Sequence, residues 1–145
     1  MKPIIVVATD EERKLAEKAF KGHKIIQTGV GGVNVYRTLK NVPRWRKIVN
    51  YGYAGSNNIP IGKEVRVMGV TTYHPNVTFL EPEWIIADKG VMCYTAGDFV
   101  TNTNIKDPCV FDMELAYIKA MGFKNVEAIK IVSDNLSLEQ YEEVI

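Results

Sequence analysis

Apolar residues occur along the chain in short continuous runs, separated by segments in which they recur with helical spacing. Continuous runs rich in β-branched residues are typical of strands buried on both faces. They predict strands at residues 2–8, 23–29, 46–55, 63–73, 90–98 and 125–135. Gly69 predicts a bulge or kink within its strand. The run at 77–86, broken by Pro82, predicts a further pair of short strands.

Helical spacing appears between these runs. It predicts helices at residues 9–20, after Gly31 and Gly32, at 110–123 and from 136 onward. In the third helix, Phe111, Leu115 and Ile118 fall on one face, and Gly122 marks its end. Strands that alternate with helices predict an α/β fold in three layers, with a mixed, mainly parallel twisted sheet flanked by helices.

Ligands of such sheets bind at the carboxyl ends of the strands. The expected strand ends carry acidic, glycine-rich and small polar residues, and they lie at 10–12, 29–32, 51–55, 95–98 and 133–135. These five short segments are therefore the candidate site.

Size and charge narrow the class of protein. The 145 residues predict one domain, residues 1–145, and the net charge of +1 with no long run of one sign gives no basis for nucleic-acid or membrane binding. The apolar stretch at 3–8 is far too short to cross a bilayer, so a cytoplasmic protein is expected. Cys93 and Cys109 lack metal-ligand spacing, and neither a metal nor a cofactor is predicted.

Taken singly, the candidate motifs have ordinary structural interpretations. The glycine-rich segment 28–32 suits a tight turn as well as an anion cradle, and acids at 10–12 suit the first turn of a helix. Glu114 has apolar neighbours, which indicates partial burial and hence a need for a partner. Asp134 suits both a helix N-cap and a catalytic acid, and its own neighbourhood does not decide between them.

The order of the motifs is more specific than any one of them. Acids after the first strand are followed by TGVGGVNVYRTL, NYGYAGSNNIPIGKEV, YTAGDFVTN, VFDMELAYIKAMG and IKIVSDN. This succession covers most of the chain and resembles the nucleoside phosphorylase and nucleosidase superfamily, especially the 5′-methylthioadenosine/S-adenosylhomocysteine nucleosidases. The segments DMELA and IVSDN carry the resemblance most specifically. It implies hydrolysis of the N-glycosidic bond of a purine nucleoside, without metal or cofactor.

The resemblance also implies roles for individual residues. Glu12 matches the residue that activates the attacking water, Glu114 the one that accepts from the ribose hydroxyls, and Asp134 the acid that protonates the purine. The remaining residues match positions that bind the substrate: Met113 at the sugar, Ser133 beside the acid, Ala54 and Gly55 at the floor, Phe99 against the base, and Asp112 as a further substrate-binding residue. An acid at the base and carboxylates at the sugar suit a reaction that separates positive charge on the sugar from negative charge on the base.

Two alternative functions stay open at the level of sequence. A phosphorylase of the same superfamily would use phosphate, but Asn50 and Tyr53 stand where its arginine and serine are expected, which favours water. A catalytically silent nucleoside-binding protein would keep the pocket, and Tyr53 would then crowd the ribose.

The chain is also short for the superfamily. Apolar surface is therefore expected to be covered by another subunit of a homo-oligomer, a dimer or larger.

Overall fold

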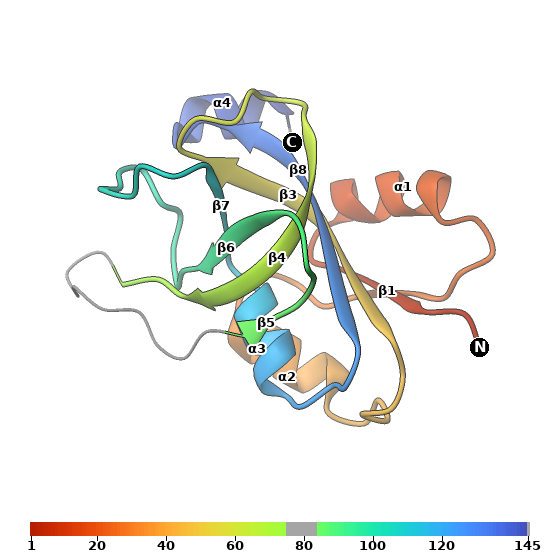
Figure 1. Ribbon diagram of the computed structural model, residues 1–145. Coiled ribbons are helices and arrows are strands. Elements are labelled where there is room, and N and C mark those ends of the chain that lie inside the picture. Colours follow the sequence, from red (N-terminus) through yellow and green to blue (C-terminus); the bar gives the residue numbers. More distant parts are fainter. Residues whose placement is uncertain (75–83, 145) are drawn as a thin grey trace.

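The computed structural model describes residues 1–74 and 84–144, which form eight strands and four helices (Figure 1). The strands are β1 (Ile4–Val7), β2 (Ile25–Gln27), β3 (Ile48–Ser56), β4 (Glu64–Thr72), β5 (Trp84–Ile85), β6 (Val91–Thr95), β7 (Cys109–Asp112) and β8 (Val126–Asp134). The helices are α1 (Asp10–Ala19), α2 (Gly32–Leu39), α3 (Leu115–Ala120) and α4 (Leu138–Val144). The first strand predicted within 77–86 lies outside the described residues, and β5 lies in the second.

All eight strands belong to one sheet of mixed orientation. Parallel pairings join β2 to β1, β1 to β3, β3 to β8, β4 to β6 and β6 to β7. Antiparallel pairings join β3 to β7, β4 to β5 and β4 to β8. The register of β4 against β6 shifts between Val67 and Gly69, which confirms the irregularity predicted at Gly69.

The sheet differs from the predicted three-layer arrangement because part of it closes on itself. Strand β3 pairs with β7, β7 with β6, β6 with β4, β4 with β8, and β8 again with β3. These five strands form a closed ring, from which β1 and β2 extend on one side and β5 on the other. Closure requires the antiparallel pairings of β7 and β4, which a pattern of buried strands does not reveal.

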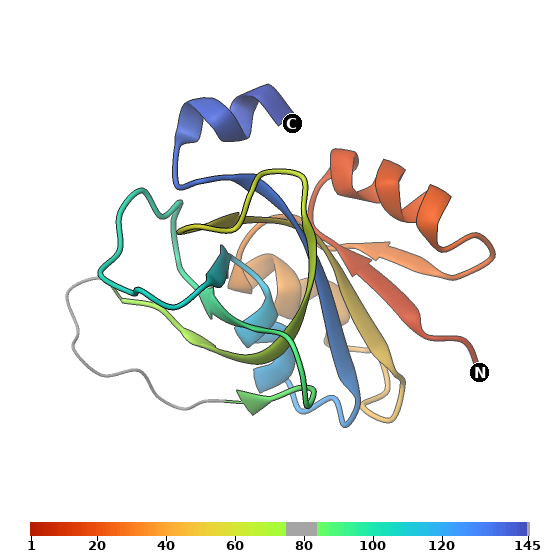
Figure 2. The same cartoon turned by 45° about the horizontal axis from the view of Figure 1, so that its top comes forward.

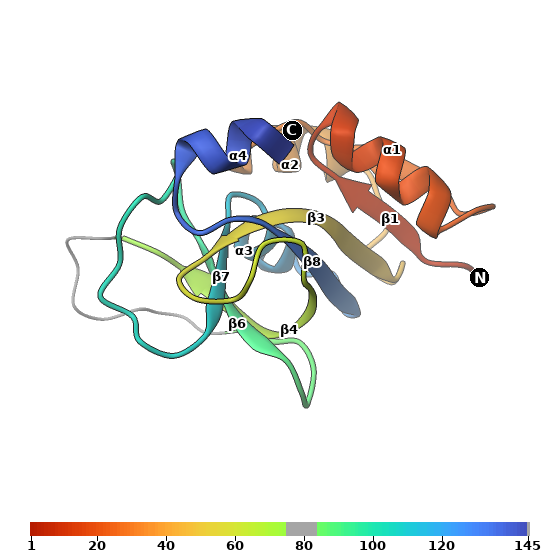
Figure 3. The same ribbon diagram turned by 90° about the horizontal axis from the view of Figure 1, so that it is seen from above.

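Helices cover two faces of the sheet, as Figure 2 shows. On one face α1 packs against a cluster that includes Val7, Val49 and Ile129. On the other face α2 and α3 pack against the larger core cluster through residues such as Leu39 and Leu115. Seen from above, α4 lies on the same side of β3 and β8 as α1 (Figure 3). The predicted α/β class with flanking helices is therefore confirmed.

The helix predicted at 110–123 is wrong in its first part. Residues Cys109–Asp112 form β7, and the helix begins only at Leu115. Phe111 pairs with Tyr94 of β6 and with Gly55 of β3, and it packs into an aromatic cluster at the end of the ring. Its helical spacing from Leu115 is therefore incidental, because sheet pairing on both edges overrides the local pattern.

None of the described helices is long and apolar enough to cross a membrane.

Candidate active site

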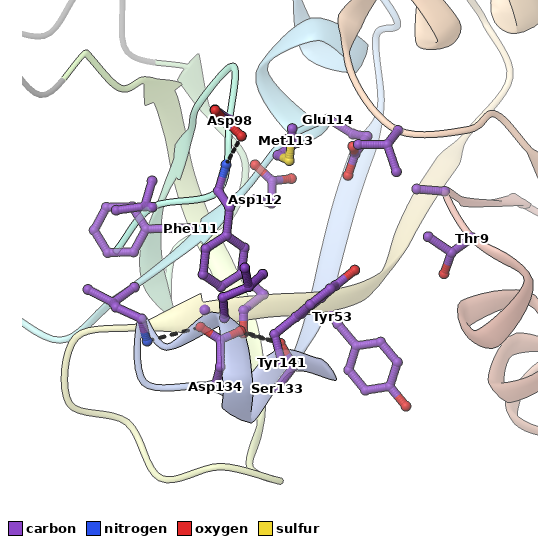
Figure 4. Close-up of a pocket in the computed structure, with 18 of the residues that line it drawn as sticks. Thr9, Tyr53, Asp98, Phe111, Asp112, Met113, Glu114, Ser133, Asp134 and Tyr141 are labelled. Carbon is purple, nitrogen blue, oxygen red and sulfur yellow. Dashed lines mark hydrogen bonds between the residues drawn. The ribbon is translucent and has the colours of Figure 1, made fainter. Parts of the chain in front are cut away.

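A pocket of about 230 Å³ opens where β3, β7 and β8 end, beneath α4. All nine residues that the sequence singled out line this pocket, although they come from separate parts of the chain. They are Glu12, Ala54, Gly55, Phe99, Asp112, Met113, Glu114, Ser133 and Asp134. Figure 4 labels Asp112, Met113, Glu114, Ser133 and Asp134 among them. The rule that ligands bind at the ends of strands selected the segments of five of the nine, Glu12, Ala54, Gly55, Ser133 and Asp134, and the family resemblance supplied the other four.

Glu12 is held rigidly by backbone amides. It lies in the first turn of α1, where Thr9 is the N-cap and accepts a hydrogen bond from the Glu12 N–H at 3.2 Å. The side chain is buried, and its Oε1 and Oε2 accept from the N–H groups of Ala8 and Tyr53, both at 2.8 Å. Each carboxylate oxygen keeps a further lone pair, so the group can still accept from a water or a sugar hydroxyl.

Gly52 leaves the space that Glu12 occupies. A Cβ at this position would lie 2.5 Å from Glu12 Oε2 and 2.6 Å from its Cδ. We therefore expect Gly52→Ala to displace the carboxylate and to lower the free energy of unfolding by about 1–3 kcal/mol, the usual cost of overpacking. Denaturant titration measures this loss. Gly97→Ala is the matched control, because a Cβ at Gly97 meets nothing within 4 Å; equal stability of the two variants would contradict the expectation.

Glu114 lies immediately before α3 and reaches the glycine-rich turn that precedes α2. Its Oε2 accepts from the Gly31 N–H at 2.9 Å, and the backbone of Gly31 has a φ of 91°, which favours glycine. The segment 28–32 is therefore a tight turn that offers one backbone N–H to the Glu114 carboxyl. Burial and the nearby Asp112 raise the pKa of Glu114 to about 7, against the opposing effect of Lys130.

Asp134 is fully buried at the end of β8. The register between β3 and β8 shifts there, so that Ala54 pairs with Val132 and Gly55 with Asp134, which leaves Ser133 as an extra residue. Asp134 Oδ1 accepts from the Ser133 hydroxyl at 2.7 Å, and Oδ2 accepts from the Leu136 N–H at 2.9 Å. Burial raises the pKa of Asp134 although these hydrogen bonds oppose the effect, so the protonated acid is favoured more than in water.

The N-cap interpretation of Asp134 is wrong. Helix α4 begins at Leu138, and the Ser137 hydroxyl accepts from the Gln140 N–H at 3.3 Å, as an N-cap does. Gln140 Oε1 in turn accepts from the Asn135 N–H at 2.8 Å. The cap of α4 is thus supplied by Ser137, three residues beyond Asp134, and the carboxyl of Asp134 faces the pocket instead (Figure 4).

Several pocket residues escaped the sequence analysis, and Tyr141 of α4 is the most prominent. Its ring lies 5.4 Å from that of Phe99, centroid to centroid, and the charges of Glu12, Glu114 and Asp134 contribute to raising its pKa after burial. The phenol therefore lies within electrostatic range of all three acids. A tyrosine one turn into a predicted helix gives no local signal of this role. Among the other lining residues, Val30, Tyr53 and Asp98 lie in the predicted strand-end segments, whereas Ala8, Thr9, Val100, Phe111, Leu136 and Leu138 do not.

Acidic and apolar side chains make up much of the pocket wall. Among the residues that line it, all of them described, there is no lysine, arginine or histidine. The acids are also not arranged for a metal, since no group of three histidine, cysteine or acidic side chains within residues 1–74 and 84–144 has the geometry of a metal site. Such a cavity can give and accept protons and can stabilise a positive charge, but it offers a bound anion no cationic partner.

No protein-family model and no curated protein sequence matches the chain significantly. The fold, in contrast, matches solved structures over nearly its whole length. Together with the ring and the pocket at its strand ends, these matches define the chain as a protein of the nucleoside phosphorylase fold. The resemblance inferred from the order of motifs is thereby confirmed at the level of fold.

Three of these structures show the likeness. Futalosine hydrolase of Helicobacter pylori has a TM-score of 0.80 and 14% identity, with 99% of this chain and 90% of that chain covered. An aspartate-to-asparagine variant of the nucleosidase MTAN of Chlamydia trachomatis, bound to MTA, has a TM-score of 0.79 and 16% identity, with 99% and 88% covered. S-adenosylhomocysteine nucleosidase of Streptococcus pyogenes has a TM-score of 0.78 and 16% identity, with 99% and 89% covered.

Proposed function

We propose that the protein is a nucleosidase that hydrolyses the N-glycosidic bond of a purine nucleoside of the 5′-methylthioadenosine or S-adenosylhomocysteine type. The observation that carries the proposal is the convergence of Glu12, Glu114 and Asp134 on one pocket that no cationic side chain lines. Solved nucleosidases of the same fold bind 5′-methylthioadenosine and its analogues, which supports this substrate class.

Each acid has a task in the proposed reaction. Asp134, whose burial favours the protonated form, donates a proton to the departing purine and so neutralises the negative charge that develops on it. Glu114 accepts from the sugar hydroxyls and stabilises the positive charge of the oxocarbenium-like transition state. Glu12, fixed by two backbone amides, orients the attacking water and accepts its proton.

The other predicted residues form the walls around these acids. Ala54 and Gly55 keep the floor low, and a Cβ at Gly55 would lie 2.8 Å from Asp134 Oδ2. Met113 lies next to Glu114 at the sugar, Ser133 hydrogen-bonds Asp134, and Phe99 with Tyr141 offers aromatic surface to the base.

We further propose that the protein acts in the cytoplasm as a homo-oligomer. Its neighbouring subunit would cover the apolar residues at the pocket mouth, Val30 and Leu138, which are 45% and 50% exposed.

The absence of cations from the pocket wall favours water over phosphate as the nucleophile, because phosphate binding relies on arginine, lysine or clustered backbone amides. We therefore expect free purine to be released from 5′-methylthioadenosine at equal rates with and without phosphate. Chromatography of the free base, with adenosine, inosine and guanosine as further substrates, measures the release. Strict dependence on phosphate would identify a phosphorylase, and binding without turnover would identify a silent nucleoside-binding protein.

A further inference from the structure

A lysine occupies a core position in the sheet beneath the pocket. Lys130 is 1% exposed and lies on the same face of β8 as Ala128 and Val132, two residues away on either side. Both of these neighbours belong to the main hydrophobic cluster. Burying an ammonium group is costly unless it is paired and hydrogen-bonded. The partners of Lys130 therefore indicate why the sheet tolerates a charge at this place.

Those partners form a closed polar network. Lys130 Nζ lies 3.1 Å from Asp112 Oδ2 and donates to Asn50 Oδ1 at 2.6 Å. Asp112 Oδ1 accepts from the Thr95 hydroxyl at 2.5 Å, and the Asn50 amide donates to the Val6 carbonyl at 3.2 Å. The ion pair is thereby tied to three further strands, β1, β3 and β6, and the attraction between Lys130 and Asp112 keeps the pKa of Asp112 below its ordinary value despite burial.

The same network fixes the start of α3, directly after Glu114. Asp112 Oδ2 accepts from the Leu115 N–H at 2.8 Å, and the Thr95 hydroxyl oxygen accepts from the Ala116 N–H at 3.0 Å. Glu114 immediately precedes these two anchored amides. Its position in the pocket is therefore determined by a layer of residues behind it.

We propose that the buried Lys130–Asp112 ion pair is a positioning unit for Glu114, which holds this carboxyl at the sugar side of the pocket and places one charge of each sign behind it. The two charges act on Glu114 in opposite directions: Asp112 disfavours its anion, and Lys130 favours it. The catalytic meaning of this arrangement depends on the proposed function, but the arrangement itself does not. The groups that face Glu114 are Asp112 of β7, Lys130 of β8, Glu12 of α1, the Gly31 N–H and Tyr141 of α4.

Opposite shifts in two single variants are the expected result. Asp112→Asn removes the anion, keeps an oxygen that can accept from Leu115, and lowers the pKa of Glu114 by about 1 pH unit or more. Lys130→Met removes the cation, keeps an unbranched side chain, and raises the pKa of Glu114 by a similar amount, about 1 pH unit. Carbon-13 NMR of glutamate-labelled protein follows the Glu114 carboxyl through a pH titration, with Glu114→Gln to assign its signal.

The double variant Asp112→Asn/Lys130→Met keeps the test decisive if Lys130→Met alone does not fold. It buries no unpaired charge, and its Glu114 pKa is expected to lie above that of Asp112→Asn, because Lys130 is then the single difference. The control is Lys47→Met, which removes the exposed 3.0 Å ion pair with Glu127 on the same strand β8 and leaves the Glu114 pKa unchanged. Shifts of equal sign in the two single variants, or a double variant identical to Asp112→Asn, would overturn the proposal.

The titration needs no substrate, so it separates this inference from the proposed function. Opposite shifts without any base release would refute the nucleosidase and leave the positioning unit intact. Base release with an unchanged Glu114 pKa would refute the positioning unit alone. In an active protein, the pH profile of kcat/KM is expected to move in the same two directions as the measured pKa.

Discussion

Replacing Asp134 by asparagine is expected to slow base release by about 10²–10⁴-fold, the usual contribution of a general acid. Asparagine has the size of aspartate, and its carbonyl oxygen can still accept from the Leu136 N–H. It carries no proton acidic enough to neutralise a departing purine, so the transition state loses its main stabilisation on the side of the base. The measurement is kcat for free purine released from 5′-methylthioadenosine.

The same substitution is expected to leave the fold at least as stable. Because burial raises the pKa of Asp134, the folded state holds the proton more tightly than the unfolded chain, and the ionised carboxylate lowers stability as the pH rises through the folded-state value. A neutral amide avoids this loss at neutral pH, so the melting temperature should be equal or higher. Asp88→Asn, at an exposed aspartate in the loop after β5, is the control. An Asp134→Asn variant with a near-normal rate would refute the acid assignment.

Glu12→Gln is expected to impair both turnover and stability. Both carboxylate oxygens of Glu12 accept from backbone N–H groups, and a glutamine can offer an oxygen to one of them only. The other N–H, of Ala8 or Tyr53, then faces an amide NH₂ and is left unsatisfied in a buried place, at a cost of about 1–3 kcal/mol. Base release should fall by about 10²–10⁴-fold as well, because the water loses its general base.

Glu11→Gln is the matched control for this experiment. Glu11 precedes Glu12 in the same turn, is 43% exposed at its side chain and contacts only Lys14 among charged groups of the described chain, at 3.8 Å. Its substitution should change neither the melting temperature nor kcat measurably. If the two variants retain the same rate, Glu12 serves only to join α1 to β3, and the water must be activated by another group.

The elements of this fold could be predicted largely from local patterns. The runs that become β1, β3 and β8 are rich in apolar residues, and the segment that becomes α1 carries a cap, acids in its first turn and an apolar stripe. Prediction failed at residues 110–114 because Phe111 is spaced helically from Leu115 while its backbone pairs with two strands distant in sequence. The closure of the ring was not predicted for the same reason. Strand order depends on contacts between residues far apart in the sequence, and no short segment of sequence contains them.

The candidate site divides in a similar way. Glu12, Glu114 and Asp134 were found because they stand in a recognisable order at the ends of predicted elements. The residues that surround these acids were not predicted. Lys130 was read as an ordinary residue of a strand, and Tyr141 as an ordinary residue of the terminal helix. A buried ion pair and an aromatic contact depend on which side of an element faces inward, and a bulge such as that at Ser133 changes that side without any signature in composition.

The closed ring also bears on how the chain behaves while it is being made. Strands β3 and β4 leave the ribosome early, yet the strand that joins them, β8, is the last of the described strands and follows β3 by some seventy residues. Until it emerges, both strands present unpaired edges rich in apolar residues, a state prone to aggregation. The strand that closes the ring therefore also supplies Asp134, so a nascent chain gains this acid of the candidate site only as its open edges become paired.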